Sequence, residues 1–302
     1  MFNVDRLRAL HAVAQHGSVA AAAAALHVTP SGVSQQLAKL EREAGQGLLE
    51  PRGRGVRLTR AGRLLASHAE RVLAQLAQAR TDLERLREDV LGPLRIAAIS
   101  TCVHALLPPT LAALGEQHPR LEVTLREGEA EVTLPQLVTG DVDVAVVESW
   151  ADLPTVVPPS ATRVTLFSDV ADLALPAGHR LAHRRVVDLT EVDDLPWIAW
   201  TAGSRCHTWL VQVLRAQDVE PRISCTVGGY PTQLALVAGN AGAALVPRLA
   251  RGRVPDGVRI VGTRPALDRT IMATCRTGEE SHGGVRAALD ALRAASARFT
   301  GW

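Results

Sequence analysis

The chain has 302 residues, of which 47% are hydrophobic and 21% are charged, as is ordinary for a soluble globular protein of two or three domains. No run of 18 apolar residues occurs, and the start of the chain lacks a signal peptide's apolar core, so we expect a cytoplasmic protein and no membrane partner. The four cysteines are far apart and form no CxxC pair, so their spacing predicts neither a zinc site nor a disulfide framework.

The charge is unevenly distributed along the chain. Residues 1–89 hold 13 basic and 9 acidic side chains, whereas the remainder holds 20 basic and 22 acidic ones. A cationic first part suits a domain that meets a polyanion.

Three short helices are predicted at the start of the chain. Apolar residues at spacings of three and four predict the first over residues 4–16, and an alanine-rich stretch predicts the second over Val19 to Leu26. Thr29 can cap a third helix and Pro30 suits its first turn, so we expect this helix to run to Glu43.

The outer face of the third helix is polar, with Ser31, Ser34, Gln35 and Lys39 projecting from it. Glutamine can pair bidentately with adenine in the major groove, and serine can bond to bases or phosphate. A solvated polar face would have the same composition, but the helix, turn and hairpin around this one favour base contact.

Residues 48–58 predict two short strands around a glycine-rich basic tip. Arg52, Arg54 and Arg57 on this hairpin suit phosphate or minor-groove contact, although a merely soluble loop is the alternative. Helix, turn, polar helix and basic hairpin, in this order, predict a winged helix-turn-helix DNA-binding domain over residues 1–59.

A long helix is expected from Thr59 to about Asp89. Its apolar positions repeat at alternating spacings of four and three, which is a heptad pattern that calls for a partner helix. We therefore predict that residues 60–91 form a dimerising linker helix, with packing on the chain's own body as the alternative. The predicted seam consists of Leu65, Ala69, Val72, Leu76, Ala79, Leu83, Leu86 and Val90.

From residue 92 onward strands and helices alternate, which predicts an α/β fold with largely parallel sheets. The length suggests two subdomains, residues 92–162 plus 267–302 and residues 163–266, with a ligand cleft between them. Strands are expected over 94–99, 121–126, 141–147, 163–166, 171–175, 197–200, 222–227, 243–246 and 271–275, and helices over 101–117, 132–139, 204–216, 231–238 and 285–298.

Three stretches carry a family resemblance: GSVAAAAAALHVTPSGVSQQLAKLERE, VRLTRAGRLLASHAERVL and GPLRIAAIST. With them the chain resembles the LysR-type transcriptional regulators over essentially its whole length. The resemblance implies a winged helix-turn-helix, a linker helix that dimerises, and a two-lobed effector domain like periplasmic binding proteins. It also implies homotetramers that bind long, imperfectly palindromic sites in promoter DNA.

The resemblance assigns DNA contacts residue by residue. They fall on Thr29, Pro30, Ser31, Ser34 and Gln35, and on the basic wing positions Arg54 and Arg57. The chain departs from the family's Leu-Phe-x-Arg before the wing, where it has Leu48-Leu49-Glu50-Pro51. Arg52 lies one residue later and can take the place of the family's arginine.

The resemblance also points to an effector site between the lobes. Ser100 and Thr101 match the family's polar pair at the start of the first helix of the effector domain. Free N–H groups at a helix start suit a carboxylate ligand. The alternative is that the two residues only cap the helix. The other candidates follow predicted strands: Glu148, Ser149, Thr201, Ser204, Val227 and Gly228.

Cys206 lies near the place where peroxide-sensing family members keep a reactive cysteine. Its neighbours Arg205 and His207 could lower the pKa of its thiol. No second cysteine follows before Cys225, so an inert cysteine is the favoured interpretation.

A regulator of transcription controlled by a small effector is thus the expected function, with no metal and no cofactor. An enzyme is the first alternative, but the GxGxxG, GxxxxGK[ST], HExxH and GxSxG motifs are all missing. A solute-binding protein for transport is the second alternative, and the missing signal peptide and the basic first part oppose it.

Overall fold

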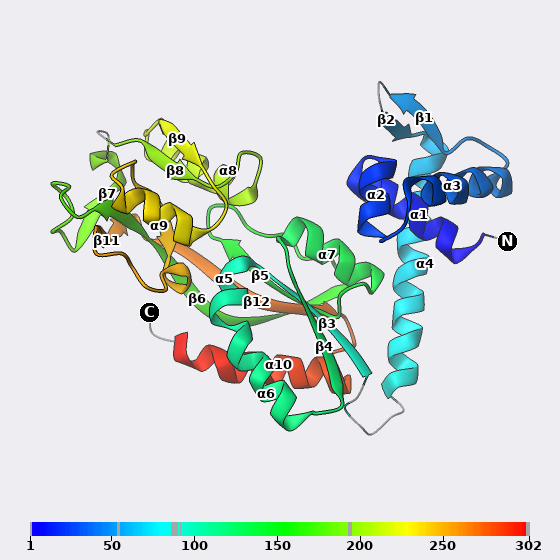
Figure 1. The fold of residues 1–302 in the computed structure, drawn as a ribbon. Coiled ribbons are helices and arrows are strands. Elements are labelled where there is room, and N and C mark those ends of the chain that lie inside the picture. Colours follow the sequence, from blue (N-terminus) through cyan, green and yellow to red (C-terminus); the bar gives the residue numbers. More distant parts are fainter. Residues whose placement is uncertain (1, 53–54, 86–89, 91, 193–194, 300–302) are drawn as a thin grey trace. The chain divides into compact units, whose positions relative to one another are not determined.

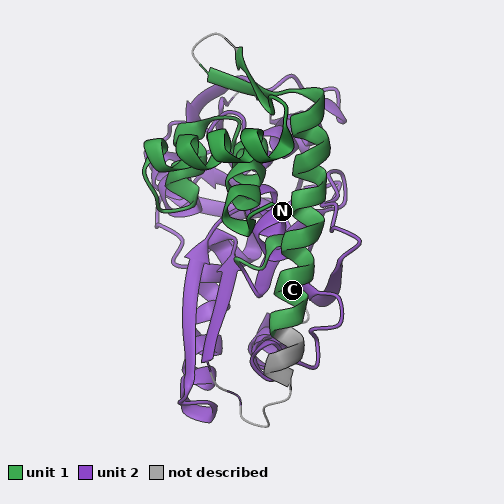
Figure 2. Cartoon of the chain, turned by 90° about the vertical axis from the view of Figure 1, so that its right-hand side faces the viewer, with its two compact units in different colours: residues 1–87, 138–141 green, residues 88–137, 142–302 purple. Residues whose placement is uncertain are grey.

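The computed structural model describes residues 2–52, 55–85, 90, 92–192 and 195–299. The chain divides into two compact units, residues 1–87 with 138–141 and residues 88–137 with 142–302 (Figure 2). Within the described ranges, no helix is both long enough and apolar enough to cross a membrane. Arg54 and Leu86, both named in the predictions above, lie outside the described residues, as do the side chains of Arg52 and Leu83.

The first unit has the predicted helices and hairpin (Figure 1). Local capping explains the helix boundaries, because the hydroxyl groups of Ser18 and Thr29 accept hydrogen bonds from the N–H groups of Ala21 and Gly32. The elements are α1 (Val4–His16), α2 (Val19–Ala25), α3 (Pro30–Ala44), β1 (Leu49–Arg52), β2 (Gly55–Leu58) and α4 (Arg60–Arg85).

The start of α4 lies against the residue that precedes β1. The N–H of Thr59 donates to the carbonyl oxygen of Leu48 at 2.9 Å. A Cβ atom at Gly62 would lie 2.0 Å from that same oxygen, so only glycine allows this approach. Gly62 therefore fixes where the hairpin ends and α4 begins.

The second unit is built on one eight-stranded sheet in the order β4-β3-β5-β12-β6-β11-β7, with β10 also paired to β6. Strands β8 and β9 form a separate parallel pair. The strands are β3 (Gly92–Ala98), β4 (Leu121–Glu127), β5 (Val144–Trp150), β6 (Ala161–Pro176), β7 (Val186–Asp188), β8 (Trp197–Ala199), β9 (Ile223–Thr226), β10 (Ala244–Pro247), β11 (Val258–Arg264) and β12 (Leu267–Arg276). The helices are α5 (Ser100–Ala105), α6 (Leu107–Gln117), α7 (Ala130–Thr139), α8 (Arg205–Arg215), α9 (Tyr230–Ala238) and α10 (Gly283–Ser296). Three short 3₁₀ turns are η1 (Leu189–Glu191), η2 (Arg248–Ala250) and η3 (Ala297–Phe299).

The prediction of largely parallel sheets is wrong for half of this unit. Strand β3 runs parallel to β4 and β5, but β12 is antiparallel to both β5 and β6, and β10 and β11 are antiparallel to β6. The two strands expected over 163–166 and 171–175 are one continuous strand, β6. Phe167 of β6 packs in the core of the first lobe and Leu173 packs in that of the second, so β6 serves both lobes.

Three further differences concern single elements. The helix expected over 101–117 is divided into α5 and α6, because Pro108 and Pro109 follow the break and cannot continue a helix from α5. Strand β5 starts three residues later than expected and extends to Trp150. Strands β7 and β11 were not predicted, because they are short or interrupted by Gly262.

In both lobes, alternate residues of the central strands face different helices. In β5, Val144 and Val146 pack in the cluster that holds residues of α6 and α10, whereas Ala145 and Val147 pack with residues of α7. In β6, Leu173 packs with residues of α8 and Ala174 packs with residues of α9. Each lobe thus has helices on both faces of its sheet, and β6 and β12 pass through both lobes.

Candidate nucleic-acid interface and ligand cleft

Helix α3 presents an exposed polar row. Ser31, Ser34, Gln35 and Lys39 are all exposed, while Val33, Leu37 and Leu40 on the opposite face are buried. Among the described residues, the side chains of Ser34, Gln35 and Lys39 have no hydrogen-bond or ion-pair partner. These groups are therefore available to another molecule.

The N-terminus of α3 is held in place by its own cap. The Thr29 hydroxyl accepts a hydrogen bond from the N–H of Gly32 at 3.1 Å and lies 3.1 Å from the Ser31 hydroxyl. Thr29 and Pro30 are themselves exposed. The first turn of α3 thus presents two neighbouring hydroxyl groups at an exposed helix N-terminus, which is an arrangement that suits a phosphate.

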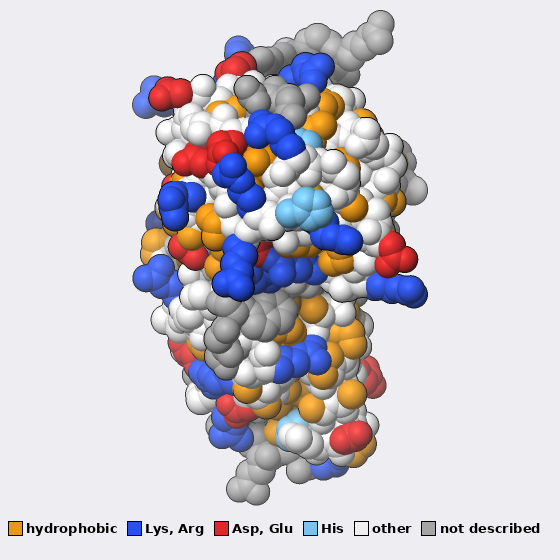
Figure 3. All heavy atoms as spheres, turned by 90° about the vertical axis from the view of Figure 1, so that its left-hand side faces the viewer, with side chains coloured by type: hydrophobic (Ala, Val, Ile, Leu, Met, Phe, Trp, Pro, Cys, Tyr) orange, Lys and Arg blue, Asp and Glu red, His pale blue; other side chains and the backbone are white. Residues whose placement is uncertain are grey.

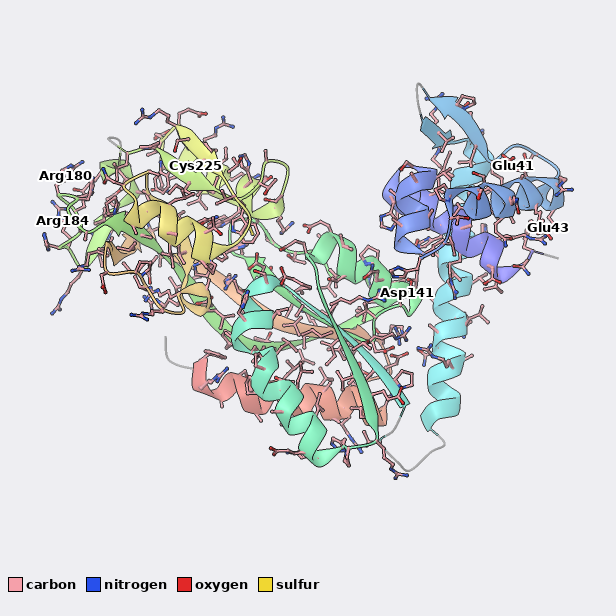
Figure 4. All side chains as sticks on the ribbon, in the orientation of Figure 1. Glu41, Glu43, Asp141, Arg180, Arg184 and Cys225 are labelled. Carbon is pink, nitrogen blue, oxygen red and sulfur yellow. The ribbon has the colours of Figure 1, made fainter. Side chains whose placement is uncertain are left out.

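Glu41 is a positioning residue that the sequence patterns did not reveal. It lies on α3 (Figure 4), and its Oε1 accepts hydrogen bonds from the N–H groups of Leu48 and Leu49, at 2.8 Å and 3.1 Å. These bonds tie the start of the β1–β2 hairpin to α3. The helix and the hairpin are therefore fixed relative to each other.

The hairpin carries one ion pair that bears on its proposed role. Arg57 Nε donates to Glu50 Oε1 at 2.6 Å, and both side chains are exposed. Glu50 belongs to the stretch in which the chain departs from the family pattern. A phosphate must therefore compete with Glu50 for Arg57.

Helix α4 has two apolar faces rather than the single seam predicted. Ala69 of the predicted seam is fully buried in the core of its own unit, beside Ala66. Val72 and Leu76 of the seam are 41% and 47% exposed, and Leu64 next to the seam is 64% exposed. The part of the seam that can meet a partner helix thus lies mainly beyond Ala69.

A groove of about 400 Å³ runs from the start of α4 to the N-terminus. Phe2, which is 43% exposed, lines it together with Leu64 and Leu65. With Val72 and Leu76 these residues form an apolar surface on the first unit, of the kind that marks contact with another protein.

In the second unit, a cavity of about 300 Å³ lies between elements of both lobes. Ser100, Thr101 and His104 line it from α5, Gly229 and Tyr230 line it at the start of α9, and Arg251 and Arg253 line it after η2. No acidic side chain is among its lining residues, although Asp172 pairs with Arg251 from behind. Arginines also gather across the end face of this unit shown in Figure 3. The cavity therefore favours an anion.

The eight predicted effector residues occupy different places. Ser100 and Thr101 line the cavity, and Gly228 precedes its lining residue Gly229. The other five do not line it. Ser149 accepts a bond from the N–H of Thr155, Ser204 caps α8, Glu148 is buried, Thr201 is exposed and Val227 is half-buried.

A buried ion network joins the lobes behind Thr101. Arg269 of β12 is 1% exposed and forms ion pairs with Glu148 of β5 and with Asp169 of β6, and its Nη2 donates to the Thr101 hydroxyl at 3.4 Å. Burial by itself would lower the pKa of Arg269, but the two carboxylates raise it, so the guanidinium stays charged. Sequence reasoning missed Arg269 and Asp169, because β6 and β12 bring together residues that are 100 apart.

Aromatic rings pack against this network. Trp150 stacks on Trp209 of α8 with ring centroids 3.7 Å apart, and Arg269 lies 5.3 Å from the centroid of Trp150. A strand of the first lobe and a helix of the second thereby share one core, as the common hydrophobic cluster also shows.

Cys206 lies beside the network. Its Sγ is 3.5 Å from Glu148 Oε1, and the side chain is 6% exposed. Burial, followed by the charge of Glu148, raises the pKa of the Cys206 thiol well above its usual range. The suggestion that Arg205 and His207 could activate this thiol is therefore not supported, because thiolate is the reactive form.

Comparisons with known proteins bear on both units. A family described as "LysR substrate binding domain" matches residues 87–297, and "Bacterial regulatory helix-turn-helix protein, lysR family" matches residues 4–63. The transcriptional activator IlvY of Salmonella typhimurium is 31% identical over 78% of this chain and 79% of its own length. A probable hydrogen peroxide-inducible genes activator of Mycobacterium avium is 33% identical over 81% of this chain and 77% of its own length. A variant of full-length OxyR from Pseudomonas aeruginosa shares the fold, with a TM-score of 0.63 and 21% identity over 98% of this chain and 97% of that chain.

Proposed function

The chain belongs to the LysR family of bacterial transcriptional regulators, and on this premise we propose which of its residues read DNA and which bind the effector. As a member, it is a DNA-binding regulator and not an enzyme, it responds to a small molecule bound in its C-terminal domain, and it forms homo-oligomers. We further propose that it acts in the cytoplasm, where promoter DNA is found.

We propose three functional parts: a DNA reader over residues 1–59, a dimerising helix over 60–91 and an effector domain over 92–302. The separation of the two compact units near residue 87 supports the second boundary. Within the effector domain, the lobes would be 92–162 with 267–302 and 163–266, since β6 and β12 pass between them.

The reader acts through the exposed row on α3, which is the observation that carries this proposal. Ser31, Ser34, Gln35 and Lys39 have the donors and acceptors that base edges and phosphates require. Thr29 and Pro30 set the helix start against the backbone, and Arg52, Arg54 and Arg57 of the wing contact phosphate.

Footprinting of the full chain on the DNA upstream of its own coding region tests this directly. We expect protection of two half-sites related by a two-fold axis, because a dimer presents two readers. Absence of protection at moderate salt, there and on other promoter fragments, would contradict the assignment of the reader.

The effector binds in the cavity between α5, α9 and η2, and we propose that it is a small anion such as a carboxylate. Support comes from the lining, which combines Arg251, Arg253 and His104 with the hydroxyl groups of Ser100 and Thr101. The remaining candidates, Glu148, Ser149, Thr201, Ser204, Val227 and Gly228, then shape the surrounding cleft rather than contact this ligand first.

A thermal-shift screen of the full chain against small carboxylic acids and small amines tests this class. We expect stabilisation by one or more acids that is lost in Arg251→Gln and kept in Arg259→Gln, a matched change on the exposed face of β11. Stabilisation by amines alone would overturn the anionic assignment.

The Mycobacterium avium relative is described as a hydrogen peroxide-inducible genes activator, yet the environment of Cys206 argues against proposing a response to peroxide here. The thiol is buried beside Glu148 and the pKa is raised, so little thiolate forms at neutral pH.

A further inference from the structure

We propose that the effector is a monocarboxylate with an apolar body, which fills the deep part of the cavity while the carboxylate stays at the mouth. This inference rests on the proposed function, because it concerns the same cavity between α5, α9 and η2. The cavity of about 300 Å³ has room for about ten groups of the size of a water molecule, each of which takes up about 30 Å³. A ligand of about the size of an amino acid therefore fits it.

The deep part of the cavity, which its buried lining residues form, is largely apolar. Leu234 of α9 and Leu249 of η2 are 2% and 5% exposed. Both leucines, and the ring of buried Tyr230, belong to hydrophobic core clusters. A ligand group that packs against these side chains gains free energy by leaving water only where it is apolar.

The ion network behind Thr101 offers this part of the cavity no counter-charge. Thr101 accepts a hydrogen bond from Arg269, whose guanidinium is shared between Glu148 and Asp169. Two carboxylates thus share one cation. A second carboxylate on the ligand would be buried there without a partner, which is costly.

The mouth of the cavity has the opposite balance of charge. His104 and Arg253 are exposed lining residues, and Arg251 is half-buried beside them in the lining. Arg251 and Arg248 both pair with Asp172, so two guanidinium groups share one carboxylate. Arg251 Nε is buried and has no hydrogen-bond partner among the described residues. One ligand carboxylate near Arg251 would supply both the negative charge and the acceptor.

These two parts together select among anions. An inorganic anion such as phosphate would leave the apolar deep part unfilled, and a dicarboxylate would bring its second charge against Leu234 and Leu249. A monocarboxylate with an alkyl or aromatic body satisfies both parts at once.

Calorimetric titration of the full chain with butyrate, pentanoate, hexanoate and adipate tests this class. We expect affinity to rise about 2- to 4-fold for each methylene from butyrate to hexanoate, because the gain from burying the methylene exceeds the cost of ordering it. Adipate has the same chain length as hexanoate but a carboxylate at each end. It should bind at least about 10-fold more weakly than hexanoate.

A space-filling variant checks that the ligand body lies in this cavity. Ala105 is a half-buried lining residue, so Ala105→Leu should weaken binding of hexanoate at least about 5-fold more than binding of butyrate. Ala112→Leu makes the same change on the exposed face of α6, outside the cavity, and should leave both affinities unaltered. Unaltered circular dichroism would show that both variants fold.

Equal affinity for the three monocarboxylates, or adipate that binds as tightly as hexanoate, would overturn the inference about the apolar body. If that binding is still lost in Arg251→Gln, the proposed anion site stands without it. Absence of binding by all four acids would instead overturn the proposed effector site together with this inference.

Discussion

At the scale of single residues, the pair between Glu50 and Arg57 decides how strongly the wing can hold DNA. The two atoms are 2.6 Å apart and the pair is exposed, so it is worth about 0.2–1 kcal/mol. We predict that Glu50→Gln tightens binding to all DNA sequences by about 1.5- to 5-fold, because Arg57 becomes free and one repulsive charge is lost.

Fluorescence anisotropy with specific and random duplexes at several salt concentrations measures this. Glu43→Gln is the control, because it removes the same charge from the Arg6–Glu43 pair on the helices. Equal tightening in both variants, or none in Glu50→Gln, would show that Glu50 does not restrain Arg57.

Glu129 makes the stability of the protein depend on pH. The pKa of Glu129 is about 7 in the folded protein, against 4.5 for an ordinary glutamate. The contribution of Glu129 to the free energy of unfolding is therefore fully favourable below about pH 4.5 and is lost as the pH rises through 7. We predict that Glu129→Gln stabilises the protein by about 1–3 kcal/mol at pH 8.5 and has little effect at pH 4.5.

Urea unfolding at both pH values gives the free energies of unfolding. Glu131→Gln removes an exposed carboxylate two residues away and should leave the pH dependence of the wild type intact. If Glu129→Gln has the same pH slope as the wild type, Glu129 is not the titrating group.

At the scale of elements, α4 shows why a heptad pattern is only partly informative. The spacing identified the apolar residues, but it could not show that Ala69 is used inside the unit while Val72 and Leu76 remain exposed. That division depends on how α1 packs on α4, which is a tertiary property.

We predict that Leu76→Glu weakens self-association at least about 10-fold. In a two-fold symmetric helix pair the introduced charge enters an apolar seam and faces like charge, which costs several kcal/mol. Sedimentation of the full chain measures the change, with Gln75→Glu as a control that adds the same charge at a neighbouring polar position. An unchanged mass distribution in Leu76→Glu would place the dimer contact elsewhere.

The helices of the first unit could be predicted almost fully from the sequence, because Gly17, Ser18 and Thr29 mark helix ends by local chemistry. The path of the effector domain could not. Strands β6 and β12 pair along their lengths, and this pairing set both the antiparallel sheet and the position of Arg269. Ser100 and Thr101 line the cavity and could be picked out because they follow β3 closely in sequence, whereas Arg251 lines it through contacts distant in sequence.

At the scale of the whole molecule, the effector domain can act as a switch because its lobes share strands and a buried network. An anion in the cavity alters the balance between lobe arrangements only to the extent that it binds one arrangement more tightly. If α4 pairs with its copy as we propose, this helix sets how far apart the two readers lie.

The most direct test of this account is to compare the base preferences of the wild type and Gln35→Ala, by selecting sites from a DNA library with randomised half-sites. We predict that Gln35→Ala loses about 1–3 kcal/mol of discrimination at one position of each half-site, while Gln15→Ala on α1 loses none. An unchanged preference in Gln35→Ala, or a uniform loss at all positions, would contradict the claim that the exposed row of α3 reads bases.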